Sequence, residues 1–209
     1  MLLVPVLAIA VVAIAAASGF HLFAPSPATA PTGVSTALTP GSDAEFSYLA
    51  AQHSNFCSLS QSTVMTYSNN SRIQGACCNP MDGTKYRWQT SGLRAYSSIP
   101  EILADPYDVS AGLAKQLLVD DSSLALTTAQ SSVFNNAAEK TVDKGWCCCH
   151  CWRWYMSEGL AKRLITKYHM GATAIAHVVD PSRPCARWAE LPSVRLLPDA
   201  LPAGRFSYR

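Results

Sequence analysis

Half of the eight cysteines in this chain stand in one run of five residues, Cys147 to Cys151, which reads Cys-Cys-Cys-His-Cys. Thiolates and imidazole bind soft and borderline metal ions, and grouped thiols also carry out sulfur redox chemistry. Trp146, Trp152 and Trp154 stand beside the run, so large apolar rings are expected to exclude water there and to strengthen electrostatic contacts. Any fold of this chain therefore has to accommodate a sulfur site at this run.

The spacing within the run limits how many of its thiols can meet. In a helix Cys147, Cys148 and Cys151 would share one face, whereas in an extended segment Cys147, Cys149 and Cys151 would do so. Either conformation brings about three thiols together. That is one ligand short of a closed tetrahedral Zn(II) site but enough for trigonal Cu(I). Further ligands are expected from elsewhere in the chain.

A second pair of adjacent cysteines, Cys77 and Cys78, is the best source of those ligands, because it lies in a turn-like Gly-Ala-Cys-Cys-Asn-Pro segment. Cys57, near His53, comes next. The predicted cofactor is a soft metal ion, Cu(I) or Zn(II). Its binding would release thiol protons, so the affinity for the metal is expected to fall as the pH falls. The predicted ligand set is Cys57, Cys77, Cys78, Cys147, Cys148, Cys149, His150 and Cys151.

Disulfide bonding is the main alternative, because exported proteins meet oxidising conditions and each bridge stabilises a modest core by about 2–4 kcal/mol. Adjacent cysteines bridge one another poorly. Cysteines from Cys57 to Cys151 are odd in number, and only Cys185 makes the count even. These features favour metal binding, alone or with some bridges, over a purely disulfide-stapled module. The Cys148–Cys151 C-x-x-C spacing leaves a thiol–disulfide oxidoreductase as a less favoured third hypothesis.

The start of the chain predicts export. Met1 to Phe20 is apolar or small throughout and carries no charge, close to the length that spans a membrane. Residues 1–24 are therefore predicted to be a signal peptide or membrane anchor, and residues 25–43, rich in Pro, Ala, Thr and Ser, a flexible linker. We expect an extracytoplasmic protein, anchored or secreted, in a prokaryotic cell envelope.

Residues 44–180 are expected to form one mainly α-helical domain with a cysteine-rich knot. Apolar residues recur every four positions from Trp152 to Tyr168, which predicts an amphipathic helix. Ser110 is placed to cap a helix, and Thr127 begins a capping-box pattern. Gly159, inside the long predicted helix, is interpreted as a close-packing position.

The C-terminal segment differs in character. Residues 181–209 are rich in Pro and Arg and are predicted to be an irregular tail, which leaves Cys185 outside the predicted site. The net charge is only +2, and the chain contains no dense Lys/Arg run or nucleic-acid motif, so no nucleic-acid partner is expected. The predicted partners are a metal ion and, through the N-terminal helix, a membrane; the sequence identifies no protein partner and does not favour an enzyme.

Several segments in order carry a resemblance: Gln74 to Met81 (QGACCNPM), Asp105 to Asp108 (DPYD), Cys147 to Trp154 (CCCHCWRW) and Glu158 to Lys162 (EGLAK). In this order the chain resembles a family of exported, cysteine-rich prokaryotic proteins of unknown function, over roughly residues 56–180. It is more distantly similar to bacterial secreted proteins and lipoproteins named for a Pro-Cys-Tyr-Cys-Gly-Cys motif. The resemblance implies export and metal handling but no established activity. The chain departs from the expected Gly-Cys-Gly type of ending after Asp180.

Overall fold

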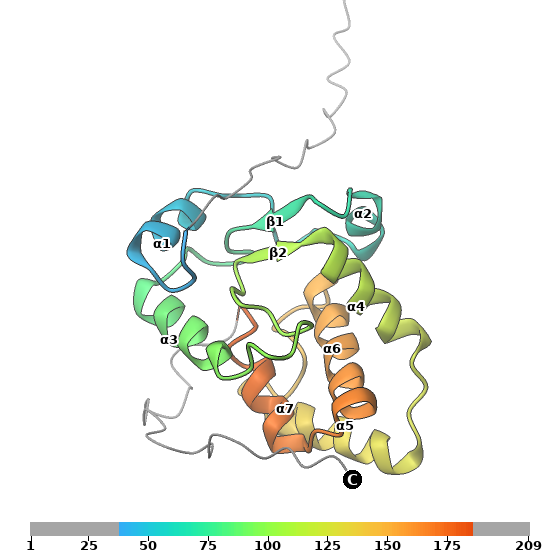
Figure 1. Cartoon of the computed structure of the whole chain (residues 1–209). Coiled ribbons are helices and arrows are strands. Elements are labelled where there is room, and N and C mark those ends of the chain that lie inside the picture. Colours follow the sequence, from blue (N-terminus) through green and yellow to red (C-terminus); the bar gives the residue numbers. More distant parts are fainter. Residues whose placement is uncertain (1–37, 186–209) are drawn as a thin grey trace, which may run out of the picture.

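A computed structural model of the chain describes residues 38–185 (Figure 1). Within them the chain is mainly helical, so the predicted fold class is confirmed. The elements are α1 (Asp43–Ala50), α2 (Gln61–Thr66), β1 (Arg72–Gln74), α3 (Gly83–Arg94), β2 (Asp108–Ser110), α4 (Ala111–Ser123), α5 (Thr128–Lys140), α6 (Trp152–Tyr168) and α7 (Ala172–Val179).

The predicted signal peptide or anchor, most of the predicted linker and the tail beyond Cys185 lie outside the described residues. None of the helices in residues 38–185 combines the length and the apolar character that crossing a bilayer requires. The folded part does, however, reach beyond residue 180. Ser182, Arg183 and Cys185 are buried, and Arg183 forms ion pairs with Asp143 and Asp180. The first residues of the predicted tail therefore belong to the domain.

The predicted capping residues begin helices at the predicted positions. Ser110 Oγ accepts a hydrogen bond from Leu113 N at the start of α4, and Thr127 forms a complete capping box with Gln130 at the start of α5. The amphipathic segment forms α6 with the predicted bounds. It ends where His169 adopts a left-handed conformation, a common helix C-terminal signal.

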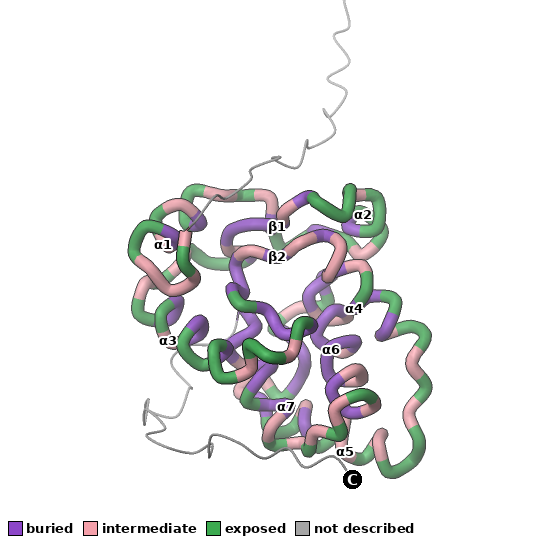
Figure 2. The backbone as a smooth tube through the Cα atoms, viewed as in Figure 1, coloured by how far each residue is buried: buried purple, intermediate pink, exposed green. Residues whose placement is uncertain are grey.

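Helix α6 is the centre of the domain. It packs against α4 on one side, with α5 and α7 at its C-terminal end, and the buried residues run along it and through the two strands (Figures 1 and 2). A Cβ atom added at Gly159 would lie 1.8 Å from Leu117 O of α4, so the two helix backbones meet at this glycine. The interpretation of Gly159 as a close-packing position is confirmed.

The described residues also contain a two-stranded antiparallel sheet, which the sequence analysis did not predict. Arg72, Ile73 and Gln74 pair with Ser110, Val109 and Asp108. After β1 the chain turns at Gly75, whose φ is +92° and whose added Cβ would lie 2.0 Å from Gln52 O. Only glycine fits such a turn, and it delivers the chain directly to Cys77 and Cys78.

A buried carboxylate gives the domain a predicted pH dependence. Asp105 accepts hydrogen bonds from Tyr86 Oη (2.5 Å) and Tyr107 N (2.8 Å), and burial raises the pKa of Asp105 from 3.8 to about 6. The folded state therefore binds this proton more tightly than the unfolded chain, and its stability falls as pH rises from about 4 to about 6. In the Asp105→Asn variant the free energy of unfolding should no longer show this decrease, which amounts to about 3 kcal/mol in the unchanged protein. Urea unfolding at pH 4, 5, 6 and 7 measures it.

Asp43→Asn is the control for this prediction, because Asp43 lies exposed on α1 in an ion pair with Arg87. It should leave the shape of the stability profile unchanged. A profile for Asp105→Asn that still falls as steeply as that of the unchanged protein would contradict the assignment.

Candidate metal centre formed by the cysteines

A short connection fixes the position of the cysteine run between α5 and α6. Thr141 Oγ1 donates a hydrogen bond to Gly145 O (2.9 Å) and accepts one from Gly145 N (3.0 Å). Arg183 Nη1 donates to the same carbonyl at 3.2 Å. Trp146, which is buried against Phe134 with ring centroids 4.4 Å apart, directly precedes the run. Arg183 thus links the segment after α7 to the α5–α6 connection.

The run itself is neither helical nor extended, so neither conformation considered for it occurs. It forms a series of bends that ends at Cys151, the residue preceding the first turn of α6. The bends turn three consecutive side chains toward one another. The sulfur atoms of Cys147, Cys148 and Cys149 lie within 4.8 Å of one another, and all three thiols are free.

Hydrogen bonds within this group favour the anionic form of Cys147. Hydrogen bonds from the thiols of Cys148 and Cys151, with further contributions from a backbone N–H and from the charge of Arg153, hold the pKa of Cys147 well below its usual value. The same hydrogen bonds raise the pKa values of Cys148 and Cys151, together with burial. These hydrogen bonds favour the thiolate form of Cys147 over those of its neighbours, and Cys151 belongs to the same group of free thiols.

Arg153 supplies a buried positive charge beside these sulfurs. Its side chain is 1% exposed, and its guanidinium carbon lies 4.6 Å from the centre of the Trp152 ring. None of its three side-chain nitrogens has a hydrogen-bond partner within residues 38–185. Burial lowers the pKa of Arg153 only to about 10, so it remains charged at neutral pH. An uncompensated buried cation is costly, and negative charge on Cys147 reduces that cost.

Four other cysteines form two disulfides. Cys57 bonds to Cys78 and Cys77 to Cys185, with Cα–Cα distances of 5.6 and 6.6 Å. Three of the predicted ligands, Cys57, Cys77 and Cys78, are therefore bridged, and because a disulfide sulfur is not a thiolate ligand, they do not offer thiolates in this bonded state. Cys185 was left outside the predicted site but completes the second bridge. It does so because residues 181–185 fold back onto the domain through Arg183 instead of leaving it.

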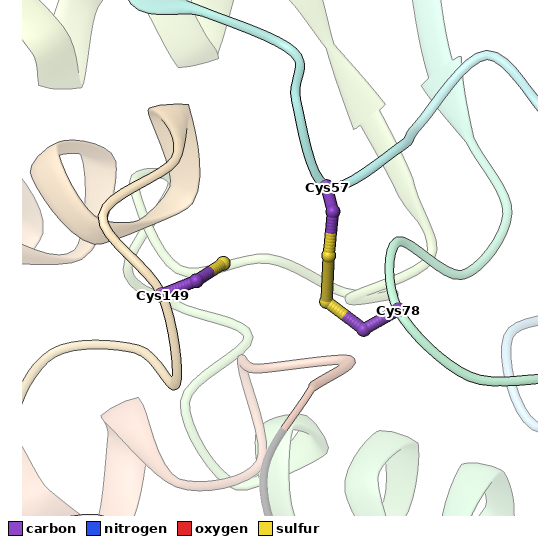
Figure 3. A group of neighbouring side chains, drawn as sticks. All are labelled: Cys57, Cys78 and Cys149. Atoms are coloured by element: carbon purple, nitrogen blue, oxygen red, sulfur yellow. A yellow bond between two sulfur atoms is a disulfide. The ribbon is translucent and has the colours of Figure 1, made fainter.

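The disulfides and the free thiols nevertheless form one connected cluster. The Cys149 sulfur lies within 4.8 Å of those of Cys57 and Cys78, and the Cys149 side chain points toward the bond between them (Figure 3). Cys78 Sγ lies 3.3 Å from Cys185 Sγ and 3.6 Å from Cys77 Sγ. Through Cys78 and Cys149, two segments about 70 residues apart in the sequence meet, and all eight cysteines of the chain are within one sulfur-to-sulfur network.

His150 does not join this network. Its ring stacks on that of Trp154, with centroids 4.0 Å apart and an interplanar angle of 26°, and it belongs to none of the sulfur groups found in the described part of the chain. It lines a surface pocket of about 580 Å³ instead, together with Cys57, Cys151 and Tyr155. This pocket connects solvent to the edge of the cysteine cluster.

Two residues of the candidate site, Cys185 and Arg153, were not assigned to it from the sequence. Cys185 could have been assigned from the odd number of cysteines before it, since one further cysteine completes the pairing. Arg153 stands between two tryptophans in the sequence and stacks on one of them, Trp152, but its place beside the thiols depends on burial that the sequence pattern does not reveal.

Comparison of the chain with protein-family models, with curated proteins and with solved structures gave no match. The resemblance to exported cysteine-rich proteins therefore stays a prediction. The cysteine groups themselves are compatible with metal binding, with disulfides, or with both together.

Proposed function

We propose that this chain is an extracytoplasmic protein that binds one soft metal ion, Cu(I) foremost, through thiolates of Cys147, Cys148 and Cys149. The observation that carries the proposal is that the sulfur atoms of these three free cysteines all lie within 4.8 Å of one another. Metal–sulfur bonds of about 2.3 Å place three ligands of a trigonal ion about 4 Å apart. Small rotations of these side chains are therefore sufficient to surround an ion.

The charge around the group supports a metal ion held by thiolates. Three thiolates and Cu(I) together carry two negative charges, and the buried Arg153 guanidinium offsets part of that excess. Soft thiolates select Cu(I) and Zn(II) over Mg²⁺ or Ca²⁺. Zn(II) is the second candidate, because Cys151, hydrogen-bonded to Cys147, offers the fourth sulfur that a tetrahedral ion needs.

The two disulfides support the extracytoplasmic part of the proposal. Disulfides form and persist mainly in oxidising compartments. They tie the segments around Cys57, Cys77 and Cys185 to one another next to the free thiols, so they can hold the ligand group in place while an ion enters or leaves. Sequestration, transfer and sensing of the ion all fit this arrangement.

The test is an anaerobic Cu(I) titration of the protein with both disulfides intact, in competition with a colorimetric Cu(I) chelator. We expect one ion per chain. Cys148→Ser should weaken binding by more than the roughly 10- to 100-fold that changes around a metal's ligands cost, because it removes a ligand. Cys148 is exposed, so the variant should keep its fold, which circular dichroism can check.

His150→Ala is the matched control, since His150 neighbours the ligands in sequence but stacks on Trp154. It should bind Cu(I) with unchanged affinity. Unchanged binding in Cys148→Ser, or loss of binding in His150→Ala, would discard this ligand set. X-ray absorption then separates the ions, with three sulfur neighbours expected for Cu(I) and four for Zn(II). Absence of any metal binding would leave a disulfide-stapled structural module as the function.

A further inference from the structure

The disulfide between Cys57 and Cys78 lies beside a ligand of the proposed metal site. Cys149 comes from the α5–α6 connection and its sulfur points toward the disulfide across the gap between the two segments (Figure 3). The sulfurs of Cys57, Cys78 and Cys149 are all within 4.8 Å of one another. That is the same mutual limit as for the three free thiols, so this second group has the geometry of a trigonal thiolate site once its sulfurs are reduced.

We propose that reduction of the Cys57–Cys78 disulfide creates a second Cu(I) site, formed by Cys57, Cys78 and Cys149, that shares Cys149 with the first. The inference rests on the proposed function, because Cys149 is a ligand in both sites. A thiolate sulfur has three lone pairs and can bridge two soft ions. The redox state of one disulfide thereby sets the number of metal ions that the protein holds.

The chemistry requires a two-electron reductant, and a dithiol is one class that supplies the electrons. One dithiol sulfur attacks the disulfide, the second closes the new S–S bond within the reductant, and the Cys57–Cys78 bond breaks with transfer of two electrons. The dithiol is oxidised to a disulfide, and its two protons pass to the released sulfurs, giving two thiols. Cu(I) then displaces the thiol protons, as thiolate binding requires.

Exposure makes this bridge the one that reacts first. Cys57 and Cys78 are both exposed, whereas Cys77 and Cys185 are 9% and 6% exposed. Cys57 also lines the pocket of about 580 Å³ that opens at the edge of the cluster. A reductant in solution therefore reaches the Cys57–Cys78 bridge before the Cys77–Cys185 bridge, which continues to hold the folded domain together.

The experiment compares Cu(I) stoichiometry before and after limited anaerobic reduction with a tertiary phosphine, which converts a disulfide and water into two thiols and a phosphine oxide. Alkylation of small samples counts the free thiols, and the phosphine is removed from the remaining protein by anaerobic gel filtration when they have risen from four to six. We expect bound Cu(I) to rise from one to two per chain. X-ray absorption should then show a short copper–copper distance, which two ions sharing one thiolate produce and two separate sites do not.

The double variant Cys57→Ala/Cys78→Ala separates this inference from the proposed function. It should bind one Cu(I) before and after the same treatment, because the group of Cys147, Cys148 and Cys149 is intact. A stoichiometry of one in the reduced unchanged protein would overturn the second site while leaving the first in place. A rise to two in the double variant would also overturn it, as would peptide mapping that finds Cys149 bridged to Cys57 in the oxidised protein. Failure to bind Cu(I) in either redox state would overturn the proposed function itself.

Discussion

Replacing both Cys77 and Cys185 with Ala is expected to lower the free energy of unfolding by about 5 kcal/mol. The two residues are 108 positions apart, so their bridge closes a loop that contains most of the folded domain. In the unfolded chain a bridge removes conformational freedom in proportion to the logarithm of the loop it closes. A loss of this size is comparable with the total stability of many domains, and urea unfolding monitored by circular dichroism measures it.

The Cys57–Cys78 bridge provides the matched comparison, because it closes a separation of only 21 residues in the same cluster. Its removal in Cys57→Ala/Cys78→Ala should cost about 3.4 kcal/mol, so the difference between the two double variants should be about 1.4 kcal/mol. Equal losses would show that loop length does not govern the effect. A larger loss for the shorter bridge would contradict the entropic argument.

The helices could be predicted because their signals are local. The capping residues Ser110 and Thr127 lie within three positions of the N–H groups they accept from, and the four-residue spacing of apolar side chains marks α6 along its whole length. The strands could not be predicted in this way. Each has three residues, too few for an alternating pattern, and they form because Gly75 and the loop before Asp108 bring them together.

For the candidate site, the sequence indicated which segments would meet but not the state of each sulfur. Cys78 and Cys149 do lie beside each other. Whether Cys77 pairs with a metal or with another cysteine depends on where Cys185 lies, and that position depends on the ion pairs of Arg183 with Asp143 and Asp180. Interactions between side chains so far apart in the sequence leave no periodic pattern, so the disulfides became visible only in the folded chain.

The contact between α4 and α6 predicts a further large effect. Gly159→Ala is expected to lower the free energy of unfolding by about 3 kcal/mol or more, because the new Cβ would lie 1.8 Å from Leu117 O and 3.0 Å from Asp121 N. Backbone atoms cannot rotate away as a side chain can, so the helices must separate. The gain in helix propensity from Gly to Ala, at most about 1 kcal/mol, is too small to compensate.

Gly92→Ala distinguishes this packing effect from the intrinsic preference of alanine for helices. Gly92 lies exposed in α3, and an added Cβ would meet only Pro181 at an ordinary distance of 3.7 Å. Gly92→Ala should therefore raise stability by about 0.5–1 kcal/mol. Because the Cu(I) ligands Cys147 to Cys149 closely precede the start of α6 in the chain, displacement of that helix by Gly159→Ala should also weaken Cu(I) binding, whereas Gly92→Ala should leave it unchanged. Stability gains of similar size in both variants would mean that α4 and α6 do not meet at Gly159.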